Sequence, residues 1–319
     1  MKTMQALQWN GTNLAVNEVP APVPAQGEVL VRLSRAGICN TDLEIIRGYY
    51  PFHGTLGHEF VGVVAQAEDD SLVGKRIVAD INASCHACRM CRAGHPHHCL
   101  KRTALGIKGR DGAFAEYLCA PRENLVLVPD NVPDEQAVFA EPLAAALEIQ
   151  EQVDFSAHGT AAVIGDGKLG LLIALSLAHS GIEVTLVGHH AERAQLPGLE
   201  TVSFCSEPPD REFPVVIEAT GSPAGFADAL RMTEPLGALV LKSTYKDPLS
   251  FNPAPLVVNE ITLVGSRCGP MDKAVAMMAA KTIDPSVLVQ ETCKLEDAVR
   301  AVDLAATKGT LKILLEMPR

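Results

Sequence analysis

Three side chains in the first fifth of the chain could together hold a metal ion. His58 and Glu59 are neighbours, and Cys39 lies a short way upstream. Imidazole, carboxylate and thiolate are the side-chain groups that bind Zn²⁺, and three protein ligands leave one tetrahedral position open for catalysis. Neighbouring residues on a strand point to opposite faces, so His58 and Glu59 can both reach one ion only if the backbone bends. Otherwise Glu59 lies outside the ligand shell, and a single His-Glu pair is more often structural.

Thr41 follows Cys39 by two residues. Its hydroxyl would then lie near the same metal, where it could pass a proton to or from a bound oxygen. The alternative is a structural role, because Glu44 follows Thr41 at the spacing of a helix capping box. The relay role depends on the metal being there.

A second cluster consists of four closely spaced cysteines in a C-x2-C-x2-C-x7-C pattern: Cys85, Cys88, Cys91 and Cys99. Four thiolates at this spacing can complete a closed tetrahedral zinc site, which supports a loop rather than catalysing a reaction. Disulfides are a poor alternative at a separation of three residues. Four histidines in the same loop are possible substitutes: His86, His95, His97 and His98.

The pattern changes after about residue 158, where short apolar strands alternate with helix-length segments and so predict a parallel sheet flanked by helices. The sequence Gly165-Asp166-Gly167-Lys168-Leu169-Gly170 follows the first of these strands and opens the first helix. In that setting, backbone N–H groups and a helix N-terminus can bind a pyrophosphate. The alternative is a tight turn without a ligand. Thr220 and Gly221 end a later strand, where such loops line the cofactor crevice.

The strand Val184–Val187 ends before Gly188, at the place where an NAD site normally carries an acidic residue for the ribose 2′-hydroxyl. Three potentially cationic residues follow: His189, His190 and Arg193. They could hold a 2′-phosphate, which favours NADP over NAD. The alternative is a solvated loop that leaves the cofactor choice open.

Composition excludes several classes of protein. The chain has 319 residues, 47% of them hydrophobic, and a net charge of -11. Nucleic acids and anionic membranes attract basic surfaces, so neither is an expected partner. The longest apolar stretch, residues 169–187, predicts a helix, a turn and a strand rather than a membrane span. The start resembles a first strand rather than a signal peptide, and an odd number of cysteines with metal-ligand spacing indicates a reducing, cytoplasmic location.

Pro142 interrupts a helical pattern that begins after Pro133. Proline inside a helix removes a hydrogen bond and clashes with the preceding turn. We therefore expect two helices that meet at Pro142, with Glu141 at the joint, where it could reach a cleft or simply be solvated.

These motifs together resemble the zinc-dependent medium-chain dehydrogenase/reductases, which include alcohol, sorbitol, threonine and glucose dehydrogenases. The matching segments appear in the family's order over nearly the whole chain: residues 37–42, 57–62, 85–99, 111–117, 141–143, 165–170 and 218–221. The resemblance implies an α/β protein with a GroES-like β-rich catalytic domain and a Rossmann domain with a doubly wound parallel sheet. The catalytic domain is expected from residues 1–142 and 265–319, and the Rossmann domain from residues 143–264.

The resemblance also implies the ligands and the reaction. The catalytic zinc would take Cys39, His58, Glu59 directly or through water, and Glu141 as a further carboxylate; the four cysteines would hold a structural zinc. Glu44 stands where liver-type enzymes carry a relay histidine, so the outer proton path differs. Glu141 replaces the second thiolate of that branch, which favours secondary alcohol, polyol or sugar substrates, oxidised with NADP or NAD. Homodimers or homotetramers are expected.

Two other functions remain open from the sequence. One is a reductase of the same fold that works on carbonyls or activated alkenes. The other is a nucleotide-binding relative without catalysis, which the open metal position formed by Cys39, His58 and Glu59 argues against.

Overall fold

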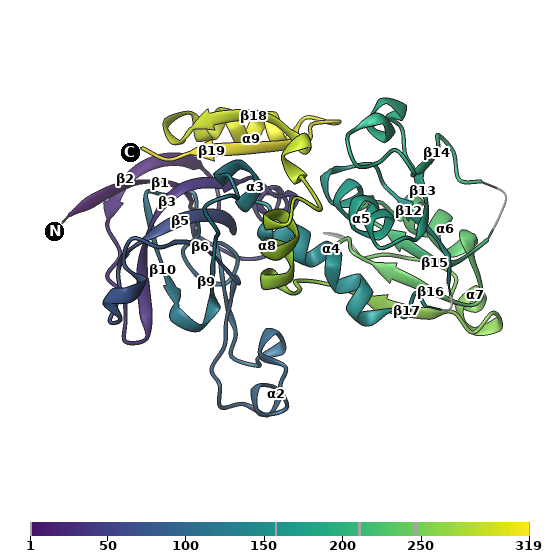
Figure 1. Cartoon of the computed structure of the whole chain (residues 1–319), viewed down its shortest axis with the longest axis horizontal. Helices are drawn as coiled ribbons and strands as arrows, with labels where there is room; N and C mark the ends of the chain where they lie inside the picture. The colour runs from purple at the N-terminus through teal and green to yellow at the C-terminus, as the bar shows by residue number, and fades with distance from the viewer. Residues whose placement is uncertain (1, 157, 210–211, 245–247, 319) are drawn as a thin grey trace. The chain divides into compact units, whose positions relative to one another are not determined.

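The computed structural model describes residues 2–156, 158–209, 212–244 and 248–318. The chain forms two compact units. Unit 1 comprises Met1–Glu141, Met271–Ala279 and Leu288–Arg319, and unit 2 comprises Pro142–Pro270 and Ala280–Val287 (Figure 1). Unit 1 thus contains segments from both ends of the chain. The predicted domain boundaries at residues 142 and 265 stay a prediction.

Unit 1 is built on a β-sheet. Its strands pair in the order β11-β6-β5-β3-β19-β18, and β10 also pairs with β3. Their bounds are β3 Glu28–Gly37, β5 Glu59–Gln66, β6 Arg76–Ala79, β10 Tyr117–Pro121, β11 Leu125–Leu127, β18 Val289–Lys294 and β19 Lys312–Glu316. Val29, Val31 and Leu33 alternate along β3 and are all buried, because residues i, i+2 and i+4 of a strand face the same side of the sheet. Leu314 of β19 pairs with Gly37, which brings the C-terminal strand beside the start of the metal-ligand segment.

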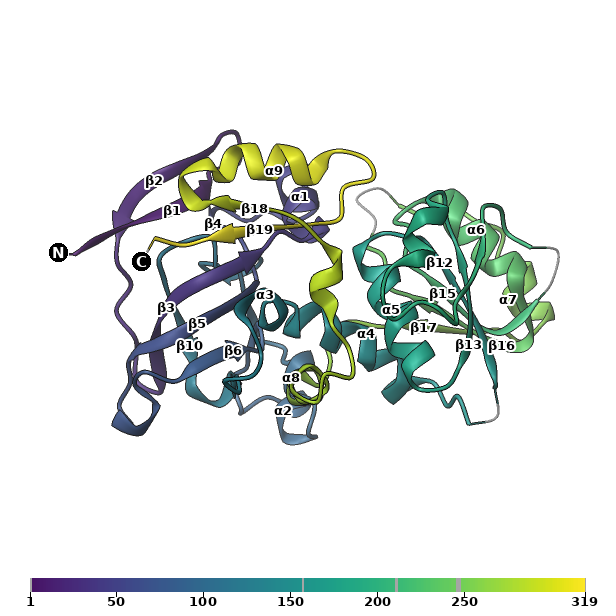
Figure 2. The same cartoon turned by 45° about the horizontal axis from the view of Figure 1, so that its top comes forward.

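Smaller elements surround this sheet. The strands β1 Thr3–Trp9, β2 Leu14–Pro20 and β4 Gly54–Thr55 form a second sheet, and β7 Asn82–Ala83, β8 Thr103–Leu105 and β9 Gly109–Arg110 form a third. The helices are α1 Asn40–Ile46, α2 Arg89–Arg92, α3 Asp134–Ala137, α8 Met271–Ala279 and α9 Ala298–Ala306. Figure 2 shows α9 lying along β18 and β19.

The chain does form two helices around Pro142, but their joint is not at the proline. The first, α3, ends at Ala137, and α4 spans Ala140–Gln152. Pro142 therefore lies in the first turn of α4, where proline is tolerated because the first N–H groups have no partner within the helix. Glu141 lies in the same turn rather than at a break. The expectation of a joint at Pro142 was wrong for this reason.

Unit 2 contains a parallel sheet with the strand order β14-β13-β12-β15-β16-β17. The strands are β12 Thr160–Ile164, β13 Glu183–Val187, β14 Ser203–Cys205, β15 Phe213–Glu218, β16 Thr233–Leu241 and β17 Thr262–Gly265. The helices are α5 Lys168–His179, α6 Pro223–Met232 and α7 Ala254–Val258. This is the strand order of a Rossmann fold, and it places the switch point between β12 and β15.

The predicted helix, turn and strand between residues 169 and 187 are present as α5 and β13. Six short strands were not predicted from the sequence: β4, β7, β8, β9, β14 and β18. Five of them have only two or three residues, and β18 shows no sustained alternation of apolar and polar residues. None of the helices in the described part of the chain is long and apolar enough to cross a membrane.

Candidate catalytic and cofactor sites

The three side chains singled out first lie together in unit 1. One ligand atom each from Cys39, His58 and Glu59 lies within 4.8 Å of the other two. His58 and Glu59 are buried, and Cys39 is partly exposed. Cys39 precedes α1, and Glu59 begins β5, so the ends of two elements converge on the site. These are the donor types and the ligand number of a catalytic zinc site.

The backbone bend needed for two adjacent ligands comes from Gly57. Its φ of +95° is a conformation that favours glycine, and a Cβ at this position would approach Phe114 to 2.4 Å. His58 consequently precedes β5 instead of occupying it, so the opposite facing of strand neighbours does not apply. Gly37 leaves room in the same way, because a Cβ there would lie 2.4 Å from Glu59 Oε2.

Asp42 orients the imidazole ring of His58 by contacting its Nδ1. Asp42 Oδ1 lies 3.1 Å from His58 Nδ1, and its Oδ2 accepts a 2.9 Å hydrogen bond from the Cys39 N–H. Nδ1 is thus engaged, and Nε2 is left for a metal. Burial lowers the pKa of His58, but Asp42 and Cys39 outweigh it, so the pKa is raised well above its ordinary value. Metal binding must therefore displace a proton from this ring.

The N-cap residue of α1 is Cys39, not Thr41, and the Cys39 N–H donates a hydrogen bond to the Asp42 carboxylate. The alternative role of Thr41 as a helix cap paired with Glu44 was therefore wrong. Thr41 Oγ1 lies 3.7 Å from Cys39 Sγ and is partly exposed. Its hydroxyl is thus beside the metal-ligand cluster.

Glu59 is held by a buried lysine from the far end of the chain. Lys312 Nζ donates to Glu59 Oε2 at 2.5 Å and lies 5.6 Å from the centre of the Phe139 ring. Burial lowers the pKa of Lys312, but the charges of Glu59, Cys39 and Asp42 and the hydrogen bond to Glu59 together outweigh it, so the pKa is raised. The second carboxylate oxygen, Glu59 Oε1, is buried without a hydrogen-bond partner. A buried carboxylate oxygen needs a partner, and a zinc ion would satisfy it, so the residues fit the metal.

Replacing Lys312 by methionine should lower the free energy of unfolding by about 3–5 kcal/mol, because it leaves a buried carboxylate without its counter-charge. The melting temperature should fall by about 10 °C. Thermal and urea unfolding measure this, with Lys308→Met as a control at an exposed lysine in the same segment. The double variant Glu59→Gln/Lys312→Met should recover much of the loss; a single variant as stable as the wild type would contradict the account.

Glu141 lies near this cluster without belonging to the group of three ligand atoms. Burial raises the pKa of Glu141 to about 7; His58 and Lys312 act in the opposite direction, and Glu59 and Asp80 add to the increase. The pKa of the Glu141 carboxyl group thus depends on the charges of His58 and Glu59 in the metal-ligand cluster. Direct coordination by Glu141 stays a prediction.

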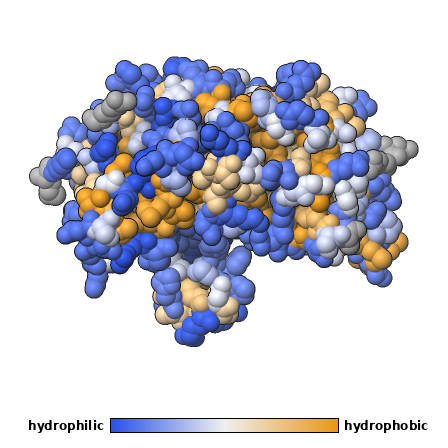
Figure 3. Space-filling view, viewed as in Figure 1, coloured by the Kyte–Doolittle hydropathy of each residue, from blue (hydrophilic) through white to orange (hydrophobic). Residues whose placement is uncertain are grey.

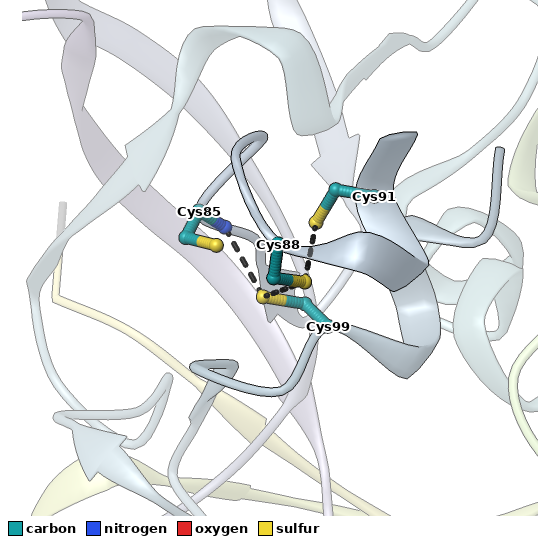
Figure 4. Close-up of side chains that lie close together, drawn as sticks. All are labelled: Cys85, Cys88, Cys91 and Cys99. Carbon is teal, nitrogen blue, oxygen red and sulfur yellow. Dashed lines mark hydrogen bonds between the residues drawn. The ribbon is translucent and has the colours of Figure 1, made fainter. Parts of the chain in front are cut away.

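The four cysteines form a separate cluster on a lobe of unit 1 that contains α2 (Figure 1). Their side chains converge in Figure 4, with Cys88 Sγ 3.5 Å from Cys91 Sγ and 3.9 Å from Cys99 Sγ. Backbone N–H groups of Cys85 and Lys101 donate to Cys99 Sγ at 3.3 Å each.

The lobe shifts the pKa values of its thiols in opposite directions. Hydrogen bonds from backbone N–H groups, the largest from Cys91, lower the pKa of Cys88 to about 6. Burial raises the pKa of Cys91 to about 11. A metal ion would stabilise all four thiolates together. The cluster is a structural zinc site: four ligands close the shell and leave no position for a substrate.

Two of the four histidines considered as substitutes have other partners. His86 Nε2 lies 2.9 Å from Glu123 Oε1, and His97 Nε2 lies 2.7 Å from Asp80 Oδ2. The grouped ligand set contains the cysteines alone among the described residues.

In unit 2, the glycine-rich loop joins β12 to α5. Gly165 has a φ of +111°, and a Cβ at Gly170 would lie 1.8 Å from the Gly165 carbonyl oxygen, so both positions need glycine. Gly167 stands at the N-cap position of α5 but has no side chain to accept a hydrogen bond from the first N–H groups of the helix. A Cβ there would meet open space. Lys168 and Leu169 begin the helix. An uncapped helix start beside open space fits a pyrophosphate.

The second loop at the switch point follows β15. Thr220 Oγ1 and the N–H groups of Thr220 and Gly221 donate to the buried Glu218 carboxylate. Gly165 lies against this loop, since a Cβ there would be 2.7 Å from Ala219 O. The two loops that the sequence assigned to the cofactor are therefore adjacent.

The cationic segment after β13 is engaged by a residue that sequence reasoning did not select. Asp166 Oδ2 accepts hydrogen bonds from the His189 N–H at 2.8 Å and the His190 N–H at 2.7 Å, and lies 2.9 Å from His190 Nδ1. Arg193 Nη1 donates to Asp166 O at 2.6 Å. Burial raises the pKa of Asp166, but the His190 and backbone hydrogen bonds outweigh it and lower the pKa.

Comparison with known proteins decides the family. Residues 25–130 match the alcohol dehydrogenase GroES-like domain. The chain is 26% identical to sorbitol dehydrogenase of Halalkalibacterium halodurans over 99% of both proteins. A zinc-binding dehydrogenase from Sinorhizobium meliloti, solved with NADP, has a TM-score of 0.90 at 28% identity, covering 99% of this chain and 100% of that one. The chain belongs to the zinc-type medium-chain alcohol dehydrogenase family.

A further relative extends the match to NADH. The alcohol dehydrogenase RspB of Escherichia coli, solved with NADH, has a TM-score of 0.89 at 25% identity, again covering 99% of this chain and 100% of that one. As a family member with both zinc sites, the chain is an NAD(P)-dependent zinc alcohol or polyol dehydrogenase. The predicted fold class and cofactors are confirmed.

Three residues that support the sites were not selected from the sequence. Asp42 could have been, because it belongs to the Gly37–Asp42 motif and lies three residues after a metal ligand. Asp166 could have been suspected as the acidic residue within the glycine-rich loop. Lys312 carried no local signal, since its partner Glu59 is 253 residues away.

Proposed function

We propose that this dehydrogenase oxidises the secondary hydroxyl of a polyol, sugar-type or other secondary alcohol, or reduces the corresponding carbonyl. The convergence of Cys39, His58 and Glu59 carries the proposal, because three ligands leave an open position for a substrate oxygen. Two carboxylates, Glu59 and Glu141, accompany a single catalytic thiolate, and the sorbitol dehydrogenase relative supports a polyol-type substrate.

The residues of this chain would divide the work as follows. Cys39 and His58, with Glu59 directly or through water and Glu141 as a further carboxylate, would hold the zinc. When bound, zinc supplies Lewis acidity and NAD(P) accepts or donates the hydride. Asp42 keeps His58 Nε2 free, and Lys312 fixes Glu59. The Thr41 hydroxyl, beside Cys39 Sγ, would take the proton of the substrate hydroxyl and pass it towards solvent.

A substrate panel tests this proposal. Oxidation of sorbitol, xylitol, 2,3-butanediol, threonine, glucose and ethanol is compared by kcat/KM, together with reduction of ketones and activated alkenes. We expect at least one secondary alcohol or polyol to exceed ethanol by about tenfold or more, because a site that hydrogen-bonds a second hydroxyl rejects substrates lacking it. Activity on alkenes alone, or turnover of no alcohol in a zinc-loaded preparation, would contradict the proposal.

For the cofactor, we propose a preference for NADP over NAD. Gly188, at the end of β13, offers no carboxylate of its own, and His189, His190 and Arg193 follow it. Together with Gly165–Gly170, Thr220 and Gly221, these residues would bind the dinucleotide. The S. meliloti relative was solved with NADP and the E. coli relative with NADH, so both forms occur among similar proteins. A kcat/KM for NADH above that for NADPH would contradict the preference.

We also propose a homodimer or homotetramer in the cytoplasm. β17 is the edge strand of the unit 2 sheet, and its unpaired backbone groups can pair with another chain. Exposed apolar residues lie on β17 and the preceding α7: Val257, Val258 and Leu263. Figure 3 shows apolar surface over α7. None of the nine cysteines is in a disulfide, which supports a reducing compartment. A monomer in light scattering at micromolar concentration would contradict the oligomer.

A further inference from the structure

The side chain of Asp166 is the centre of a hydrogen-bonded cluster at the end of β13. It reaches from the glycine-rich loop after β12 to the segment after β13, across a separation of 24 residues to His190. Its Oδ2 is shared by the N–H groups of His189 and His190 and by His190 Nδ1. Asp166 is 7% exposed, so this arrangement is nearly closed to solvent.

Gly188 is part of the same arrangement. A Cβ at this position would lie 2.4 Å from both Cβ and Cγ of Asp166 and 2.6 Å from its Oδ2. No side chain fits at Gly188 while Asp166 lies there. An NAD site usually carries an acidic residue at the end of this strand. Here the carboxylate at that place belongs to Asp166 of the glycine-rich loop, and it accepts hydrogen bonds from N–H groups of the protein.

His190 and Arg193 are fixed by this carboxylate in different ways. His190 is partly exposed and has Nδ1 against Asp166, which leaves Nε2 as the ring nitrogen available to a ligand. Arg193 is 8% exposed, and its Nη1 lies 3.6 Å from Asp166 Oδ1 in addition to its bond to Asp166 O. The guanidinium thus lies beside Asp166 as its counter-charge.

We propose that Asp166 is a positioning residue for cofactor choice: it holds His190 and Arg193 in place so that the segment after β13 binds the 2′-phosphate of NADP. This inference rests on the proposed NADP preference and adds which residue positions the side chains that would bind the 2′-phosphate. Asp166 does not touch the phosphate; it acts through the His190 ring, whose Nε2 would bond to a phosphate oxygen.

The charges around Asp166 favour a positioning role for this residue over electrostatic repulsion of the 2′-phosphate. The Asp166 charge is matched by the guanidinium of Arg193, and three N–H groups point at Oδ2. Because Nδ1 of His190 is held against Asp166, the ring would donate a charge-assisted hydrogen bond through Nε2 to a phosphate oxygen. A fixed ring also loses less side-chain entropy when it binds.

The test measures binding rather than turnover. Calorimetric titration of the full-length, zinc-loaded protein with adenosine 2′,5′-bisphosphate and with 5′-AMP compares ligands that differ only in the 2′-phosphate. We expect the wild type to bind the bisphosphate about tenfold more tightly or better, as charge-assisted hydrogen bonds imply. Asp166→Asn keeps an acceptor for the backbone N–H groups but removes the charge, and it should lose most of this ratio with 5′-AMP affinity nearly unchanged.

A second variant and a control keep the result decisive. His190→Asn retains a donor for Asp166 but lacks Nε2, so it should also lose the ratio, even if Asp166→Asn fails to fold. Glu192→Gln removes an exposed charge from the same segment and should change neither affinity.

The outcomes separate the two proposals. A wild type that binds 5′-AMP as tightly as the bisphosphate contradicts the NADP preference and, with it, the phosphate site. A wild type that prefers the bisphosphate, with the ratio unchanged in both variants, overturns the role of Asp166 alone. Tighter binding of the bisphosphate by Asp166→Asn would show that Asp166 repels the phosphate, the opposite of this proposal.

Discussion

Replacing Cys39 by serine should lower kcat/KM for alcohol oxidation by about a thousandfold or more, since a catalytic metal contributes several kcal/mol to stabilising the transition state. Serine lacks the thiolate that holds zinc beside His58 and Glu59. The zinc content should fall from two ions per chain, one for each ligand group, to one. Steady-state kinetics and elemental analysis of the same preparation measure both effects.

The matched control is Cys119→Ser, which removes a partly buried free thiol outside both ligand groups. It should retain both metal ions and full activity. Cofactor binding should be unaffected in Cys39→Ser, because the glycine-rich loop belongs to unit 2. A Cys39→Ser variant that folds, carries one zinc and oxidises alcohol at the wild-type rate would show that zinc at this position is not catalytic.

The second large effect is expected at the four-cysteine lobe. Cys88→Ser should release the structural zinc and lower the melting temperature by about 10 °C, because binding of a structural zinc is coupled to folding. Cys88 is the cysteine whose pKa is lowered to about 6 by backbone N–H groups, and its sulfur lies next to those of Cys91 and Cys99. The remaining three thiolates cannot close the tetrahedral shell.

Limited proteolysis separates a local from a global effect. Cleavage of Cys88→Ser should begin within residues 85–99, while the catalytic zinc remains bound. The protruding lobe is visible in Figure 3. Cys119→Ser again serves as the control for loss of a thiol. A Cys88→Ser variant with unchanged zinc content and stability would mean that the four cysteines do not hold a structural metal.

Local sequence was sufficient for those features whose residues are close along the chain. The four cysteines lie within 15 residues, and the Gly165–Gly170 loop follows directly on its strand, so spacing alone predicted both. The convergence of Cys39 with His58 required the family resemblance, because 18 residues separate them. Once Gly57 and its φ of +95° are known, the adjacent placement of His58 and Glu59 follows.

The parts that sequence reasoning missed depend on long-range packing. Lys312 reaches Glu59 because β19 pairs with β3, a contact between the two ends of the chain. Asp166 reaches His190 because β12 and β13 are neighbours in the sheet, which no local pattern encodes. The joint misplaced at Pro142 has a different cause: a proline within a helical pattern can stop one helix or stand in the first turn of the next, and the pattern alone does not distinguish the two.

The most direct test of the central claim, that an open zinc site is formed by Cys39, His58 and Glu59, is a crystal structure with anomalous diffraction measured on both sides of the zinc absorption edge. We expect two anomalous peaks per chain, one among the four cysteines and one bonded to Cys39 Sγ and His58 Nε2 with a position left for substrate. A peak in the lobe alone, from a preparation that oxidises alcohols at its full rate, would contradict it.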